Sequence, residues 1–322
     1  MFLKIKYKWR TFLIAIVLAG LAIFTIALNR EHWNKKMTIP FPPHIEVHLG
    51  QHGNDWKKTY GDIVEINDKN PGLSFYSIDP DNYKQTVSTD IKTGTMTTTI
   101  HNTMRIEGTE DRDRSVGFAD VNIYAKVNKG GMLPHQEAYQ YVTNLIHDLR
   151  KKGWTYNLYE TDPRLKGKAA LNYFKQNNLD PDYPLSFNEW MTLPAPLHWR
   201  FYADNTYLEL TVDRDIKNLD PKNPGAYFIS LSFQTREEAE RTGLPENEKD
   251  HWRGNWVKRA LSYRSERNIA EAKLRAQGIP IDPKPPLANW PTPWKPGPRK
   301  SARTTPKPAR KPTATCNTTP TR

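Results

Sequence analysis

The sequence lacks the features by which many exported domains and enzymes are recognised. It contains one cysteine, Cys316, so neither an internal disulfide nor a zinc site built from several cysteines can form. It contains no Walker loop, no dinucleotide-binding glycine motif, no G-x-S-x-G nucleophile elbow and no H-E-x-x-H pair. These absences exclude the recognisable classes of enzyme. We therefore expect a protein without catalytic activity and without a cofactor.

Charged residues are absent from residues 11–28, which read TFLIAIVLAGLAIFTIAL. As a helix this segment is ~27 Å long, close to the ~30 Å hydrocarbon core of a bilayer. Four basic residues lie in residues 1–10, which places this end in the cytoplasm by the positive-inside rule. A cleaved signal peptide is the alternative, with a passable cleavage site at 25–27. The apolar run is longer than such peptides usually have, so the sequence predicts a retained transmembrane helix in contact with the lipid bilayer.

The net charge of +12 is unevenly distributed along the chain. Residues 1–36 carry +6, residues 249–278 carry +5 and residues 279–322 carry +8, which leaves the body, 37–248, at −7. Recognition of nucleic acid requires a basic patch on a folded surface, whereas these basic residues lie at the ends of the chain. Nucleic acid is therefore not an expected partner.

Alternating apolar residues predict a strand-rich domain over residues 44–236, preceded by a linker at 29–43. Asp204 and Asn205 are typical of a hairpin turn between two of its strands. The acidic residues 107–113 are predicted to form another turn. Strands are expected at 44–49, 95–106, 116–127, 154–159, 199–203, 207–212 and 226–233.

One strong helix is predicted after the third of these strands. Ala138, Val142 and Leu149 belong to an apolar stripe at helical spacing, basic residues fill the last turn, and Gly153 ends the helix. A shorter helix is predicted at 166–177. The expected fold is α+β, a mainly antiparallel sheet with one main amphipathic helix and one minor helix.

The C-terminal part of the chain changes composition twice. Residues 246–278 form a basic helical segment, whose tryptophans are expected to pack on the domain; docking on a membrane surface is the alternative. Residues 279–322 contain 12 of the 26 prolines and nine Lys or Arg residues, so we expect a disordered tail. The tail is interpreted either as a solvated spacer or as a ligand for anionic envelope polymers such as peptidoglycan.

One segment of the chain offers a candidate metal site. His44, Glu46 and His48 share one face if this segment is a strand, and imidazole with carboxylate can bind zinc. A solvated polar face opposite Ile45 and Val47 explains the same pattern. The acidic motifs at 79–81 and 180–182 are interpreted as Asp-Pro turns.

About a third of the chain resembles a group of proteobacterial envelope proteins that have an N-terminal anchor. The resemblance rests on aromatic and turn residues at 153–154, 162–165, 182–186, 189–190 and 199–204. Some proteins of this group accompany type VI secretion effectors in the manner of immunity proteins. The long Pro/Lys tail departs from the group.

The resemblance implies a bacterial inner-membrane protein with residues 1–10 in the cytoplasm and most of the chain in the periplasm. It also implies a binding module, of the immunity type that binds and neutralises a secreted effector. Two alternatives stay open: a structural envelope protein that engages peptidoglycan through its tail, and an enzyme with an unrecognised active site.

Overall fold

The computed structural model describes residues 41–283. The predicted cytoplasmic end, the transmembrane helix 11–28, most of the linker and nearly all of the tail lie outside these residues. Within residues 41–283, no helix is both long and apolar enough to cross a bilayer.

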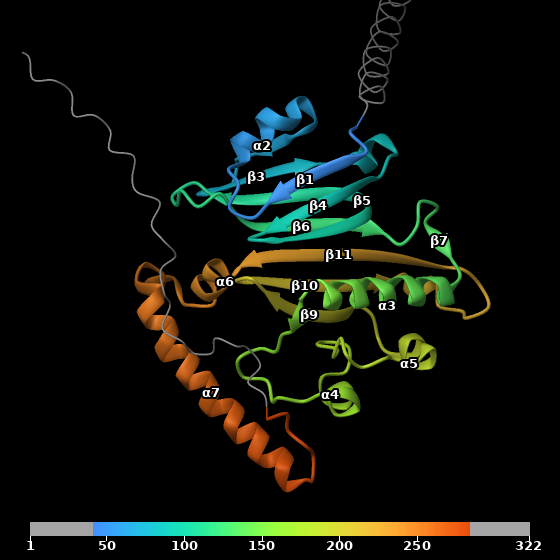
Figure 1. The fold of residues 1–322 in the computed structure, drawn as a ribbon, viewed down its shortest axis with the longest axis vertical. Helices are drawn as coiled ribbons and strands as arrows, with labels where there is room; N and C mark the ends of the chain where they lie inside the picture. The colour runs from blue at the N-terminus through green and yellow to red at the C-terminus, as the bar shows by residue number, and fades with distance from the viewer. Residues whose placement is uncertain (1–40, 284–322) are drawn as a thin grey trace, which may run out of the picture. The chain divides into compact units, whose positions relative to one another are not determined.

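An eleven-stranded sheet forms the centre of the described part (Figure 1). Its main path is β1-β4-β5-β6-β11-β10-β9-β8, with β3 also paired to β5, β2 to β3, and β7 to β11. Among the described strands only β1 and β4 pair in parallel. The strands are β1 His44–His48, β2 Glu65–Asn67, β3 Leu73–Ile78, β4 Val87–Thr93, β5 Met96–Asp111, β6 Phe118–Lys126, β7 Met132–Leu133, β8 Thr155–Tyr156, β9 Leu197–Ala203, β10 Thr206–Arg214 and β11 Gly225–Thr235.

Helices from several parts of the chain pack around this sheet. In Figure 1, α3 runs alongside β11 and β10, α2 lies near β1 and β3, and α7 extends away from the sheet. The helix α5 begins with a capping box, in which the Ser186 hydroxyl and the Glu189 carboxylate each bond the other residue's backbone N–H. The helices are α2 Gly53–Tyr60, α3 His135–Lys151, α4 Gly167–Phe174, α5 Phe187–Thr192, α6 Arg236–Thr242 and α7 Trp252–Ala276.

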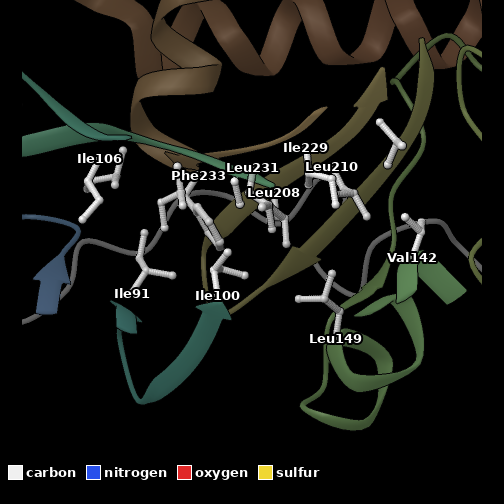
Figure 2. Close-up of a cluster of buried hydrophobic side chains, with 14 of the residues drawn as sticks. Ile91, Ile100, Ile106, Val142, Leu149, Leu208, Leu210, Ile229, Leu231 and Phe233 are labelled. Atoms are coloured by element: carbon white, nitrogen blue, oxygen red, sulfur yellow. The ribbon is translucent and has the colours of Figure 1, made fainter. Parts of the chain in front are cut away.

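The core lies on one face of the sheet, which we call the inner face. Successive strand residues point to opposite faces, and in β11 the buried residues are Tyr227, Ile229, Leu231 and Phe233. Figure 2 shows strand side chains meeting Val142 and Leu149 of α3. Each of these buried aliphatic side chains contributes roughly 1.5–3 kcal/mol of transfer free energy.

A second, smaller apolar cluster joins α7 to α4. It contains Leu158, Leu165, Ala170, Phe174 and Leu274. At the other end of α7, Trp252 is buried and Trp256 is half-buried. The tryptophans therefore pack on the domain, as the sequence analysis expected.

The fold class is α+β with a mainly antiparallel sheet, as predicted, and the main helix expected to end at Gly153 is α3. The hairpin at residues 204–205 joins β9 to β10. The turn expected at 107–113 is wrong, because β5 continues to Asp111 with β3 paired on one side and β6 on the other. The strand expected at 154–159 shortens to β8, since only two residues pair with β9. The short helices α2, α5 and α6 and the strands β2, β3, β4 and β7 were not predicted.

Candidate binding surface and pocket

The side chains opposite the core form what we call the outer face of the sheet. Cross-strand register arranges them in rows that run over β5, β6, β11, β10 and β9. One row contains Arg105, Tyr124, Ser230, Thr211 and His198; the next contains Glu107, Asn122, Ser232, Glu209 and Arg200.

An aromatic pair lies in the middle of this face. The rings of Tyr124 and Phe228 stack with centroids 5.9 Å apart and an interplanar angle of 24°. Phe228 is 39% exposed, although it is a large apolar side chain in a central strand. The pairing of these two residues therefore leaves an apolar surface accessible on an otherwise polar face.

Arg105 is the cross-strand neighbour of Tyr124 and is held in place by two carboxylates. Its guanidinium donates hydrogen bonds to Asp79 (Oδ2, 3.0 Å) and to Glu107 (Oε2, 2.7 Å). These bonds fix a planar donor group beside the aromatic pair, and the cross-strand neighbours of Phe228 are Lys126 and Asp213. Aromatic residues and arginine are the residue types enriched at the energetic centres of protein interfaces.

A pocket of about 420 Å³ lies where α6 and α7 approach the end of the outer face. Its walls come from β9, β10, β11, α6, α7 and the segment after β8. The aromatic side chains that line it are Tyr159, Tyr207, Trp256 and Tyr263, and the polar ones are Asn157, Glu160, Thr161, Arg200, Gln234 and Glu240.

Arg200 lines this pocket in a constrained position. Its guanidinium carbon lies 3.4 Å from the centroid of the Tyr159 ring, and its Nε lies 3.7 Å from Oε2 of Glu209. Its Nη1 is buried and has no hydrogen-bond partner among the described residues. Asn157, which is 3% exposed, likewise has a buried Oδ1 that no group in residues 41–283 satisfies. Two residues that line the cavity therefore each carry one buried polar atom that has no hydrogen-bond partner within residues 41–283.

Two carboxyl groups of the pocket have altered acidity. Burial raises the pKa of Glu160 and of Glu240. The negative charge of Glu240 raises the pKa of Glu160 further, and that of Glu237 raises the pKa of Glu240. Glu240 forms an ion pair with Arg236 (2.5 Å), which only partly opposes this effect. No Lys or Arg of the described chain lies within ion-pair distance of Glu160. Glu160 is therefore the acid that a ligand can still pair with.

The candidate metal residues His44, Glu46 and His48 do share one side of β1, because Ile45 and Val47 are buried between them. Their contacts diverge, however: His44 pairs with Asp90 (3.1 Å), and Glu46 binds both His48 (2.7 Å) and Lys92 (2.6 Å). Across residues 41–283 there is no group of three or more His, Cys, Asp or Glu placed to hold a metal. The contacts of His44 with Asp90 and of Glu46 with His48 are those of a solvated polar face on β1.

The Asp-Pro motifs serve local structure. Asp79 accepts a hydrogen bond from the backbone N–H of Asn82 at the start of a 3₁₀ turn, and Asp180 accepts bonds from the N–H groups of Gly167 and Asp182. The residues that line the pocket were not singled out from the sequence. They come from four separate segments, and no sequence spacing connects Asn157 and Glu160 to Arg200 or Glu240.

Comparisons of the chain with protein-family models, with curated proteins and with solved structures found no match. The resemblance to anchored envelope proteins therefore stays a prediction from the sequence.

Proposed function

We propose that this protein is a binding module of the bacterial envelope, anchored by residues 11–28, that binds another protein through the outer face of its sheet. The partner is a secreted effector that the module neutralises from the periplasmic side of the inner membrane. The membrane anchor and the effector rest on the sequence analysis. The choice of surface rests on the structure.

The stacked Tyr124–Phe228 pair is the observation that supports this surface. An exposed Phe in the centre of a sheet face has no role in the core, which lies on the opposite face. An apolar centre with a polar surround is the arrangement of a specific protein interface. In the register Tyr124 lies between Arg105 and Ser230, and Phe228 lies between Lys126 and Asp213. Arg105 and Lys126 are already held by ion pairs with carboxylates, so little side-chain entropy is lost on binding.

The size of the face is adequate for part of an interface. Five strands ~4.8 Å apart and seven residues long at ~3.3 Å each give roughly 450 Å² in projection. A standard interface takes about 800 Å² from each partner, so the rims of the face must contribute as well. Neither Tyr124 nor Phe228 lines the pocket at the end of this face. The surface around this pair therefore supports protein binding better than a catalytic role, which needs a cavity that excludes water.

The test is capture from an envelope extract of the native organism, with the detergent-solubilised full chain as bait. We expect one protein to be retained in a one-to-one ratio and to be lost with the double variant Tyr124→Ser, Phe228→Ser. Glu266→Lys, on the exposed side of α7, is the matched control and should retain it. Co-expression should then show that the captured protein is toxic alone and harmless together with the chain.

Deletion of residues 284–322 separates this proposal from the tail-driven alternative. If cell-wall material is retained by the full chain and lost only on this deletion, the tail is the functional element and the proposed surface is wrong. Equal capture by wild type and by the double variant would also contradict the proposal. A captured protein that is not toxic would leave the binding surface standing and exclude the immunity role.

A further inference from the structure

The pocket beneath α7 has a chemistry that the outer face lacks. The lining of this cavity of about 420 Å³ includes an arginine and an asparagine that each carry one unsatisfied polar atom, and a glutamate, Glu160, that forms no ion pair within residues 41–283. From this we infer that the pocket binds a small zwitterion of dipeptide size, with its carboxylate on Arg200 and its ammonium group on Glu160 and Asn157. This inference is independent of the protein-binding surface.

Arg200 is suited to hold the carboxylate. Stacking on Tyr159 and the contact with Glu209 fix the plane of its guanidinium, so the group is pre-organised for a planar anion. Its buried Nη1 carries donors that no group of the described chain accepts. The Arg200 side chain keeps 18% of its surface exposed, so a ligand carboxylate can reach the guanidinium and form short, charge-assisted bonds with it.

Glu160 and Asn157 are suited to hold the ammonium group. An ammonium ion has three donors and no acceptor, and it needs oxygen atoms around it. The Glu160 carboxyl offers them at the cavity wall, and Asn157, whose Oδ1 is buried and unsatisfied, lies in the same segment after β8. Asn157 is anchored there by a backbone bond from its N–H to the carbonyl of Arg200 (2.9 Å), so the two ends of the site are physically linked.

The remaining walls define the size and polarity of the ligand. Tyr207, Trp256 and Tyr263 present ring surfaces, while Gln234 and Thr161 present groups that can bond an amide. A pocket of this volume is at the lower end of the range for small-molecule sites, ~300–1,000 Å³. An uncapped dipeptide has two charged ends, one amide and small side chains, and it matches each of these walls.

Isothermal titration calorimetry on the detergent-solubilised full chain tests the inference. The probes are L-alanyl-L-alanine and D-alanyl-D-alanine. Preference for the first would indicate a ligand derived from ordinary peptides, and preference for the second a ligand of cell-wall origin. At least one dipeptide should bind. Its N-acetylated form, without the ammonium group, and its C-terminal amide, without the carboxylate, should each bind ~10-fold more weakly or less.

Two substitutions assign the ends. Glu160→Gln should weaken dipeptide binding ~10-fold or more, so that the dipeptide and its N-acetylated form bind this variant with nearly equal affinity. Arg200→Gln should likewise make the affinities of the dipeptide and of its C-terminal amide nearly equal. Asp213→Asn, on the outer face, is the control and should bind as wild type. Circular dichroism and the melting temperature verify that each variant is folded.

Three results would overturn the inference. Absence of binding by both dipeptides to the folded wild-type chain is the first. The second is equal binding of capped and uncapped forms. The third is binding of N-acetylglucosamine, with dependence on Glu160 and Arg200, in place of the dipeptides, which would make the pocket a sugar site. None of these results affects capture of a protein by the outer face, so the two proposals fail separately.

Discussion

Arg164 and Glu271 form a bidentate ion pair between the loop before α4 and the helix α7. Both guanidinium–carboxylate distances are 2.7 Å, and the Glu271 side chain is 1% exposed. The backbone N–H of Arg164 bonds the same carboxylate at 3.1 Å. The pair therefore fixes the far end of α7, whose other end forms a wall of the ligand pocket.

Glu271→Gln should destabilise the protein by about 3 kcal/mol, because it leaves the Arg164 guanidinium without its charge partner. Burial alone would raise the pKa of Glu271, but the hydrogen bonds and charge of Arg164 outweigh it and lower the pKa below its ordinary value. The contribution of Glu271 is therefore present above the pKa of an unfolded Glu and is lost as pH falls through the lower folded value. Urea unfolding at several pH values measures the stability that Glu271 contributes, and Glu266→Gln, at an exposed position of the same helix, is the control. An unchanged unfolding midpoint in Glu271→Gln would contradict a stabilising role for this ion pair.

Asp120 has the opposite effect on stability. Burial and the nearby Glu238 raise its pKa to about 6. A carboxyl whose pKa is raised in the folded state binds its proton more tightly there, so its penalty is absent at low pH and grows as pH rises from about 4 to about 6. Asp120→Asn should therefore stabilise the protein by up to ~3 kcal/mol at pH 7.5 and leave it nearly unchanged at pH 4. Urea unfolding at the two pH values decides; equal effects at both would exclude this explanation.

Gly117 joins the start of β6 to the segment after β1. Its φ is +69°, and a Cβ there would lie 2.7 Å from the carbonyl oxygen of Gln51 and also against that of Gly50. Both carbonyls are fixed next to Phe118, whose N–H bonds Gln51 at 2.8 Å. Gly117→Ala should therefore cost ~3 kcal/mol or more, from backbone strain and a clash that cannot relax.

Gly254 is the matched control for Gly117. It lies in α7, and an added Cβ would contact nothing within 4 Å. Gly254→Ala should stabilise the protein by ~0.5–1 kcal/mol, because alanine has the higher helix propensity. Thermal unfolding of the two variants should thus shift in opposite directions, and a shift in the same direction would contradict the structural difference between them.

Dipeptide binding should depend on pH through Glu160. Burial raises the pKa of Glu160, Arg200 opposes this, and Glu240 and Asp162 add to it. A ligand ammonium group would lower the pKa again, so binding expels the proton from any protonated Glu160. Affinity should therefore increase as pH rises through the raised pKa of Glu160 and then level off. In Glu160→Gln this increase should be reduced; a slope as steep as that of wild type would assign the proton to Glu240 or Asp162.

The sequence determined the parts of the fold that have local, periodic signals. Alternation of apolar residues places Tyr227, Ile229, Leu231 and Phe233 on one face of β11, and 3-4 spacing gives α3 its buried stripe. The same periodicity puts His44, Glu46 and His48 together on the polar side of β1. These features depend on residues close together in the chain, and they need no knowledge of the partner strand.

Pairing between distant segments decided the rest. The acidic residues 107–111 carry turn-like composition, and they are a strand because β3 and β6 both bond to them. Trp190 and Tyr202 are buried while Tyr207 lines a pocket, a difference that their sequence neighbours do not encode. The pocket itself unites residues 157–160, Arg200 and Glu240, which a sheet register and a docked helix bring together. A cavity with unsatisfied polar atoms is a property of that assembly, because each atom's partners are fixed only when all of the walls are in place.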